Sequence, residues 1–267
     1  MVYEDPLPPG RGTRVLAIAN QKGGVGKTTT AINLGTALAA INQNVLLIDL
    51  DPQGNASTGL GVSLEQRQIN TYSLLVENCV FLDAVQSTKI PRLNIIPSGL
   101  DLYGAEIDLI LENRREYKLR ESLVQAIGAY DYILIDCPPA LGLLTINALV
   151  AAQAVLVPLQ CEFYALEGVS QLVKTIEQVK LAFNASLEIQ GIVLTMHDQR
   201  NNLSVDVEED VRSFFGDKVY ETVIPRNVRV SEAPSHGVPV LIYDIDCAGA
   251  KAYLALAGEV IERERRV

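Results

Sequence analysis

The 267-residue sequence predicts an α/β fold with a mainly parallel central β-sheet that is flanked by helices on both faces. Apolar runs rich in Val, Ile and Leu alternate with segments of helical periodicity along most of the chain, which is the order expected of βαβ units. Several of the runs are continuous rather than alternating, as expected of strands that are buried on both faces. The composition, 48% hydrophobic and 20% charged, suits a globular protein with a substantial core.

The apolar runs are predicted to be strands because they are short and rich in β-branched residues. The predicted strands cover residues 14–19, 44–49, 93–97, 132–136, 154–158, 189–195 and 218–224. The predicted helices lie between them, near 27–40, 104–127, 142–152, 165–183, 203–215 and 248–264. Residues 53–92 are the least regular, and we expect short helices and loops there, packed over the ligand-binding edge of the sheet.

Neither an internal repeat nor a long low-complexity linker interrupts the pattern, so we expect a single domain over residues 14–267. Residues 1–13 are polar and proline-rich and are expected to form a flexible tail without the features of a targeting peptide. The longest apolar stretch, 148–159, is too short to span a bilayer and is interrupted by Gln153 and Pro158. These features predict a soluble, cytoplasmic protein.

Charge and cysteine usage exclude some classes of function. The net charge of −10 argues against a surface coated with positive charge for nucleic acid or membrane, although a local basic patch remains compatible with it. The four cysteines are far apart and form no C-x-x-C pair, which favours reduced thiols over a disulfide framework or a thiolate metal site.

The stretch NQKGGVGKTTT (20–30) lies between a predicted strand and a predicted helix, which is the context of a phosphate-binding P-loop. In the pattern G-x-x-x-x-G-K-[ST] the first glycine is replaced by Gln21, and a second lysine, Lys22, follows it. Glycines let backbone N–H groups approach phosphate oxygens, and the helix N-terminus adds a positive dipole end. Lys27 is expected at the outer phosphates and Thr28 at a Mg²⁺ ion. The sequence therefore predicts a nucleoside triphosphate site, formed by Gly23, Gly24, Val25, Gly26, Lys27, Thr28 and Thr29.

Acidic residues follow two other predicted strands, at the edge where the loop also lies. Asp49 and Asp51 occur in DLDPQGN, and Asp136 follows an apolar run in ILIDCPP. Ligands of such sheets bind beyond the carboxyl ends of the strands. Asp136 is expected to hold Mg²⁺ through water, as a Walker B aspartate does. Asp49 either caps the following helix or takes a direct part.

These motifs together resemble those of the deviant Walker A ATPases, and within them of the ParA/Soj chromosome- and plasmid-partition ATPases. MinD and nitrogenase iron protein share the loop KGGVGKT. The segments PLQCEFYALEGVSQL (158–172), GIVLTMHDQRNNLS (191–204) and IPRNVRVSEAPSHGVPVLIYD (224–244) are similar to the partition subfamily's own. The resemblance covers about residues 14 to 262 and implies a P-loop NTPase fold and ATP hydrolysis.

The resemblance also implies roles for single residues. Lys22 would reach across an ATP-dependent homodimer to the phosphates of the partner's nucleotide, a task that suits a flexible point charge. Asp51 would orient or activate the attacking water, so that the catalytic residues would be Lys22, Lys27 and Asp51. Hydrolysis would be slow until a ParB-like adaptor accelerates it. Pro225 and Asn227 would lie against the adenine, although both also suit a simple turn at the end of a strand.

Partition ATPases of this family bind double-stranded DNA without sequence preference as the ATP dimer. The matching positions are Arg200 and Arg229, and phosphate contacts by arginine are independent of sequence and sensitive to salt. Such a protein would be cytoplasmic and associated with the nucleoid. Weaker candidates for DNA contact are Arg226, Lys218 and Lys251. The two histidines, His197 and His236, are expected to be structural or surface residues.

Five alternatives remain at this level. A MinD-like membrane regulator should end in an amphipathic helix, which KAYLALAGEVIERERRV does not resemble. An iron–sulfur ATPase would need two cluster cysteines, for which only Cys137 and Cys161 are candidates. A related tyrosine kinase should have a tyrosine-rich tail. A scaffold that binds nucleotide without hydrolysing it, or a positioning ATPase for another cargo, would share the motifs.

Overall fold

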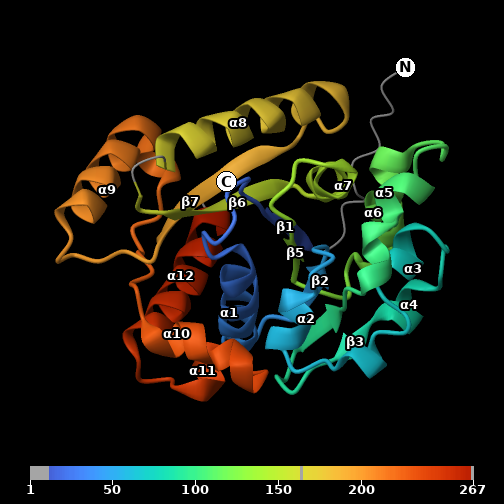
Figure 1. Cartoon of the computed structure of the whole chain (residues 1–267), viewed down its shortest axis with the longest axis horizontal. Coiled ribbons are helices and arrows are strands. Elements are labelled where there is room, and N and C mark those ends of the chain that lie inside the picture. The colour runs from blue at the N-terminus through green and yellow to red at the C-terminus, as the bar shows by residue number, and fades with distance from the viewer. Residues whose placement is uncertain (1–11, 163–164, 266–267) are drawn as a thin grey trace.

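The structure, a computed structural model, describes residues 12–162 and 165–265. Its centre is a seven-stranded sheet in the order β3-β4-β2-β5-β1-β6-β7 (Figure 1). Every neighbouring pair is parallel except β3 and β4, which confirms the predicted mainly parallel sheet. The strands are β1 Arg14–Ile18, β2 Val45–Asp49, β3 Gln86–Ser87, β4 Leu93–Ile96, β5 Tyr132–Asp136, β6 Ala154–Gln160 and β7 Glu188–Thr195.

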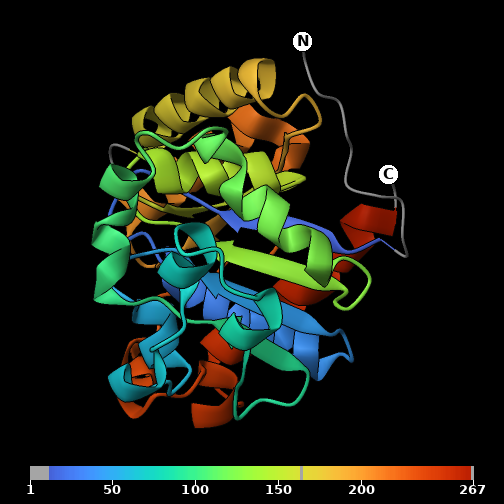
Figure 2. The same cartoon turned by 90° about the vertical axis from the view of Figure 1, so that its right-hand side faces the viewer.

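Helices cover both faces of the sheet, as Figure 2 shows from the side. One apolar layer is formed mainly by α1, α2, α11 and α12, and the other by α3, α4, α6, α7, α8 and α9. The α-helices are α1 Lys27–Ala40, α2 Asn55–Gly59, α3 Thr71–Leu75, α4 Phe81–Ala84, α5 Ala105–Asp108, α6 Lys118–Leu123, α7 Leu143–Ala151, α8 Ala165–Ala182, α9 Asn202–Phe215, α10 Val228–Glu232, α11 Val240–Tyr243 and α12 Ala248–Arg265. The 3₁₀-helices are Leu64–Gln66, Leu100–Tyr103, Arg115–Tyr117, Val124–Ala126, Gly216–Lys218 and Ala233–His236.

The central strand β5 shows why the apolar runs are continuous. Ile133 and Ile135 join the layer of α7 and α8, whereas Tyr132 and Leu134 join the layer of α1 and α12. Because successive side chains of a strand point to opposite faces, a strand covered on both sides needs apolar residues at every position.

The predicted helix over 104–127 is wrong as a single element. The segment contains α5, α6 and two 3₁₀-helices instead. Arg114 adopts a φ of 56°, a left-handed conformation that interrupts a helix. The side chain of Asn147 on α7 then bonds to the backbone on both sides of the start of α6, accepting from Leu119 and donating to Arg115. Such side-chain bonds replace part of the helical ladder.

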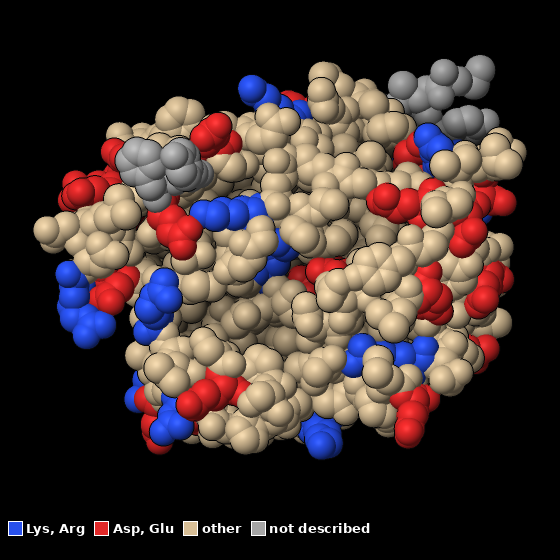
Figure 3. Space-filling view, viewed as in Figure 1, with Lys and Arg blue, Asp and Glu red and all other residues tan. Residues whose placement is uncertain are grey.

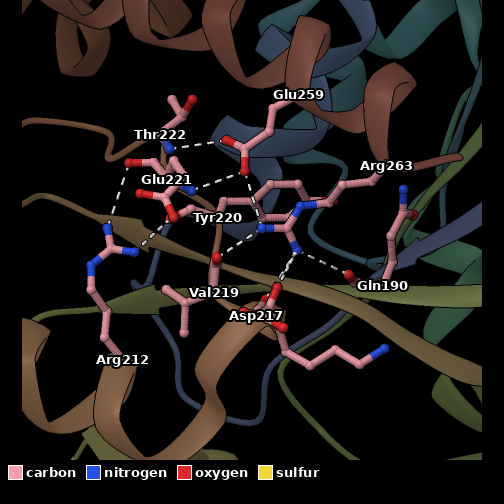
Figure 4. Close-up of polar contacts among 10 residues, drawn as sticks. Gln190, Arg212, Asp217, Val219, Tyr220, Glu221, Thr222, Glu259 and Arg263 are labelled. Carbon is pink, nitrogen blue, oxygen red and sulfur yellow. Dashed lines mark hydrogen bonds and ion pairs between the residues drawn. The ribbon is translucent and has the colours of Figure 1, made fainter. Parts of the chain in front are cut away.

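The predicted strand 218–224 is also wrong, because side chains rather than a neighbouring strand bind most of its backbone (Figure 4). Arg263 of α12 donates to the carbonyls of Asp217 and Val219 at 3.0 and 2.7 Å. Glu259 of the same helix accepts from the N–H groups of Glu221 and Thr222. Only isolated backbone contacts with β7 remain, from Tyr220 and Ile224 among them.

The expected tail falls largely outside the described residues, since its first eleven positions are not described. Thr13, which the sequence pattern placed in the tail, is 3% exposed. Its hydroxyl donates to the carbonyl of Tyr130 and accepts from the N–H of Gly128. The packed part of the chain therefore includes Thr13.

Candidate functional site

Residues 19–26 connect β1 to α1 at the carboxyl edge of the sheet. Gly24 and Gly26 have φ angles of 76° and 87°, which glycine adopts without steric cost. A Cβ atom on Gly23 or Gly24 would meet no heavy atom within 4 Å, so the turn is open to an incoming group. No side chain caps the N-terminus of α1, where Lys27, Thr28 and Thr29 form the first turn. An anion with several oxygens fits this loop.

The ammonium of Lys27 lies inside the loop. The residue is 7% exposed, and Nζ donates to the carbonyl of Lys22 at 3.0 Å. Burial lowers the pKa of Lys27, while the nearby charges of Asp136 and Asp51 act in the opposite direction. A buried cation beside open backbone N–H groups is the arrangement that holds a phosphate group.

Lys22 has a different environment. Its backbone N–H donates to Oδ1 of Asn20, which fixes the turn. Its side chain is 39% exposed, and Nζ forms an ion pair with Glu162 Oε2 at 2.5 Å. Lys22 also lines a surface hollow with Glu167, on α8. The two lysines of the loop therefore direct their charges to different places.

Asp49 and Asp136 end the neighbouring strands β2 and β5 in register, and both are fully buried. Asp49 accepts hydrogen bonds from the N–H and hydroxyl of Ser57 at 2.8 and 2.6 Å and from the N–H of Asp51 at 3.3 Å. Burial raises the pKa of Asp49 to about 6. Its bonds to Ser57 of α2 support the structural alternative for this residue.

Asp136 has no partner comparable to Ser57. Neither of its carboxyl oxygens forms a hydrogen bond of regular geometry among the described residues, although the Thr28 hydroxyl lies close to the carboxylate. Burial and the neighbouring Asp49 raise the pKa of Asp136 well above its usual range, whereas the Thr28 hydroxyl and Lys27 lower it. A buried carboxylate without partners is costly, and a divalent cation with oxygen ligands removes that cost. Asp136 and Thr28 therefore fit the predicted Mg²⁺ site.

Asp51 lies on the same side of the loop, two residues beyond β2. It is 8% exposed, and its Oδ1 accepts from the N–H of Gln53 at 3.0 Å. Its negative charge raises the pKa of both Lys27 and Asp136. The structure thus brings Asp51, Lys27 and Asp136 together, as expected from the strand ends.

Pro225 and Asn227 lie beside the end of β7. Pro225 forms an isolated bridge with His197, and the N–H of Arg226 donates to the His197 carbonyl. Asn227 Oδ1 caps α10 by accepting from the N–H of Arg229 at 2.9 Å. The side-chain oxygen of Asn227 is therefore engaged in the turn, and an adenine contact stays a prediction.

Arg200 and Arg229 are exposed but not unpaired. Arg200 is bidentate to Asp198, at 2.9 Å from Nε and from Nη2, and this contact holds the pKa of Asp198 at about 2. Arg229 pairs with Glu232 at 3.1 Å. The bridge at His197 brings the loop of Arg200 close to Arg226, whose charge also lowers the pKa of Asp198.

The weaker candidates are dispersed. Lys218 lines a hollow at the opposite, amino edge of the sheet with Arg14 and Gln153. Lys251 lies on α12, near Asp246 at 3.8 Å. Lys251 is on a helix that packs against α10, which carries Arg229, but neither lysine shares an acidic partner with Arg200 or Arg229 among the residues that the structure describes.

Sequence reasoning missed several residues that hold the site. The hydroxyl of Thr195 donates to the Val25 carbonyl at 2.8 Å and so ties β7 to the phosphate loop. Glu162, the partner of Lys22, lies in the family-like segment 158–172, but no role was assigned to it there. His197 is buried and contacts Glu208 of α9 at 2.9 Å, in line with the structural role expected for it.

Cys137 and Cys161 are both buried free thiols. Burial raises the pKa of Cys161 to about 11 and that of Cys137 further. Both effects disfavour the thiolates that iron–sulfur ligation requires.

Among residues 12–162 and 165–265, no helix is both long and apolar enough to cross a membrane. The terminal helix α12 instead buries Tyr253, Leu256 and Val260 in the core.

Comparison with known proteins supplies the family. A model described as an AAA domain matches residues 13–189. The chain is 63% identical over 254 residues to the chromosome partitioning protein ParA of Caulobacter vibrioides, covering 94% of this chain and 95% of that one. It is 52% identical to the sporulation initiation inhibitor protein Soj of Bacillus subtilis, covering 92% and 98%.

A solved structure from Mycobacterium smegmatis, named cobyrinic acid a,c-diamide synthase and holding an ATP analogue and magnesium, superposes with a TM-score of 0.84 at 37% identity, covering 95% of this chain and 96% of that one. Its name refers to another chemistry, but the partitioning relatives are much closer in sequence and match over nearly the whole chain. With the open phosphate loop, its two lysines and the clustered aspartates, these matches agree on one assignment: the chain belongs to the ParA/Soj family of chromosome-partitioning ATPases.

Proposed function

We propose that this protein hydrolyses ATP slowly, forms a homodimer that depends on ATP, and binds double-stranded DNA without sequence preference as that dimer. A ParB-like adaptor then accelerates hydrolysis and returns the protein to the monomer, which drives chromosome or plasmid segregation. The observation that carries this proposal is the placement of the two loop lysines. Lys27 is buried inside its own loop, while the half-exposed Lys22 directs its charge outward to Glu162.

The nucleotide and Mg²⁺ are carried over from the M. smegmatis structure, which holds an ATP analogue and magnesium in a similar fold. The loop N–H groups and Lys27 would bind the outer phosphates, and Pro225 and Asn227 would lie at the adenine. Thr28, and Asp136 through water, would hold Mg²⁺, which would neutralise phosphate charge when bound. The unpaired oxygens of buried Asp136 support this assignment.

Asp51 is proposed to orient the attacking water. Its Oδ1 is occupied by the Gln53 N–H, and its carboxyl is close enough to Lys27 to raise the lysine's pKa. Lys22 is proposed to act on the partner's nucleotide. Two lysines beside one phosphate chain add positive charge that only a triphosphate compensates, so dimerisation would depend on ATP.

DNA would be bound by Arg200 and Arg229, and the protein would then be associated with the nucleoid. We prefer this function to that of a MinD-like membrane regulator because α12 uses its apolar residues in the core. The alternative is that the same ATPase cycle positions another cargo. Only the identity of the adaptor protein distinguishes this function from the segregation of chromosomes or plasmids.

Two substitutions test the proposal. Lys22→Ala should abolish ATP-dependent dimers and DNA binding while monomeric nucleotide binding persists, as measured by light scattering and by fluorescence with a labelled nucleotide. Asp51→Ala should lose turnover but keep ATP-dependent dimers and DNA binding. A Lys22→Ala protein that still dimerises with ATP would contradict the sandwich dimer, and unchanged turnover in Asp51→Ala would contradict its role as the catalytic acid.

A further inference from the structure

Residues 100–111 place five large apolar side chains on the surface. Leu100, Tyr103, Ile107, Ile110 and Leu111, which we name the apolar stripe, are 70%, 54%, 73%, 55% and 92% exposed. The stripe runs over the 3₁₀-helix Leu100–Tyr103, α5 and the turn that follows. In Figure 1, α5 lies beside α6 on the flank opposite α9.

The same segment is apolar on its inner side. Leu102, Ala105 and Leu109 are completely buried, and the first two belong to the apolar layer that also contains α7. A helical segment with apolar residues on both its inner and its outer side is usually buried against other protein on both sides. Large apolar side chains gathered on a surface mark an interaction site more often than scattered ones do. The outer side of residues 100–111 is therefore a candidate interaction surface.

The charge around the stripe specifies the kind of partner. From Leu100 to Glu112 the sequence has four acidic residues and no Lys or Arg; of the basic residues that follow, Lys118 pairs with Glu112 and Arg115 donates to the Ile110 carbonyl. Two of these acids are fixed in place, because Asp101 accepts from Asn70 and Asp108 from the hydroxyl of Tyr72, both at 2.9 Å. The flank over α3 to α6, on the right of Figure 3, shows more red than blue. A second copy would bring the same acidic residues to this surface, whereas a basic partner is complementary to it.

The stripe also contacts the loop of the proposed catalytic aspartate. The hydroxyl of Tyr103 is hydrogen-bonded to Nε2 of Gln53, whose backbone N–H donates to Asp51 Oδ1. Glu106 of α5 lies against Gly142, where an added Cβ would overlap the Glu106 carboxylate. Gly142 is the last residue of the loop 137–142, which directly follows Asp136 at the end of β5. Residues 100–111 therefore contact both loops that carry the acidic residues of the site.

We propose that the apolar stripe is the docking surface for a basic segment with apolar anchors on the partner protein that accelerates hydrolysis. Tyr103 is a positioning residue in this arrangement, because its hydroxyl connects the docked surface to Gln53 and, through it, to Asp51. This inference rests on the proposed function, in which that partner is the ParB-like adaptor.

The first test compares ATP turnover at increasing concentrations of the ParB-like protein from the same organism. Ile107→Ser combined with Leu111→Ser should raise the adaptor concentration for half-maximal stimulation about tenfold, with the basal rate unchanged. Phe214→Ser on α9 and Ile242→Ser on α11, which belongs to the opposite layer of helices, are the matched controls, at side chains that are 70% and 60% exposed, and should leave stimulation intact. Tyr103→Phe should keep adaptor affinity but lower the maximal stimulated rate.

The outcomes separate the inference from the function. If wild-type protein is not stimulated by the adaptor, the proposed function fails and the inference fails with it. If wild type and the serine variant are stimulated equally, only the inference fails.

A photo-reactive amino acid at position 111, with position 242 on the opposite layer of helices as control, locates the partner directly. Cross-linking of the adaptor at 111 alone supports the proposal. Cross-linking of a second copy of this chain at 111, or of neither protein under conditions where the adaptor stimulates turnover, would overturn it.

Discussion

Lys22 and Lys27 are five positions apart in one loop, yet their ammonium groups have different partners. Lys27 is bound to a carbonyl of its own loop, and Lys22 is bound to Glu162 after β6. Gln160 bonds to the second oxygen of Glu162 and so orients it. For Lys22 to reach a partner's nucleotide, it must leave Glu162. The free energy by which the Lys22–Glu162 ion pair stabilises the monomer is therefore lost on dimerisation, so the pair opposes dimerisation.

Glu162→Gln should strengthen ATP-dependent dimerisation. A half-exposed ion pair is worth up to about 1 kcal/mol, so the dimer constant should rise by up to about fivefold. Glu167→Gln is the matched control, since Glu167 is exposed in the same hollow and has no ion pair to Lys22 among the described residues. Analytical ultracentrifugation with a non-hydrolysable ATP analogue measures the constant. Equal dimerisation of wild type and Glu162→Gln would show that the pair does not restrain Lys22.

Asp49 makes stability depend on pH in a predictable direction. Burial raises its folded-state pKa to about 6, above the usual value of 3.8. A raised pKa gives stability that is present below about pH 4 and is lost as pH rises through about 6. In Asp49→Asn this loss should disappear, which reduces the fall in unfolding free energy between about pH 4.5 and 7 by on the order of 2 kcal/mol.

Urea unfolding in the presence of EDTA and without nucleotide measures this effect. Asp83→Asn, at an exposed carboxyl on α4, serves as the control and should follow the wild-type pH profile. An Asp49→Asn profile parallel to that of the wild type would show that another group, such as Asp136, takes up the proton.

At the scale of elements, α12 fixes the segment 216–222 to the rest of the molecule. Arg263 donates to the carbonyls of Asp217 and Val219, pairs with Glu259 at 3.0 Å and lies 4.1 Å above the ring of buried Tyr220 (Figure 4). Its removal leaves the part-buried Val219 carbonyl without this donor and uncovers the buried ring of Tyr220, and both effects are costly.

Arg263→Ala should lower the free energy of unfolding by about 2–4 kcal/mol, as judged from urea midpoints at constant m-value. Arg265→Ala, at an exposed residue of the same helix, should change it by less than about 0.5 kcal/mol. Nucleotide binding should be retained below the unfolding transition, because Arg263 is at the amino edge and the phosphate loop at the carboxyl edge.

Local chemistry explains which elements could be predicted from sequence. The unit of β1, phosphate loop and α1 is specified by consecutive residues, and the predicted helix 27–40 has the bounds of α1. The predicted strand 218–224 fails because its backbone partners, Glu259 and Arg263, are about forty residues away in the sequence. Glu162 and Tyr103 were missed for the same reason, since their partners Lys22 and Gln53 are joined to them only by the fold. Spacing could indicate the strand-end aspartates, but not that Asp49 is bonded to Ser57 and Asp136 has no comparable partner.

At the scale of the whole molecule, charge limits how DNA can be bound. The chain has a net charge of −10, and both candidate arginines are paired with acidic residues in the monomer. Phosphate must compete with Asp198 for Arg200 and with Glu232 for Arg229. One copy therefore offers few contacts to DNA phosphates, and a dimer offers twice as many to the same DNA duplex.

DNA affinity should accordingly fall steeply with salt and require the ATP dimer. If two copies contribute about four phosphate contacts, affinity should drop about a hundredfold between about 50 and 200 mM salt. Arg200→Ala combined with Arg229→Ala should abolish most of the DNA binding and, with it, most of the dependence of DNA affinity on salt. Lys89→Ala, at an exposed residue near the amino end of β4, should leave both unchanged. Fluorescence anisotropy with duplexes of unrelated sequence measures both the slope and the lack of sequence preference. Equal DNA binding by the ADP-bound monomer would contradict the claim that DNA binding requires the ATP dimer, because one copy alone would then supply enough phosphate contacts.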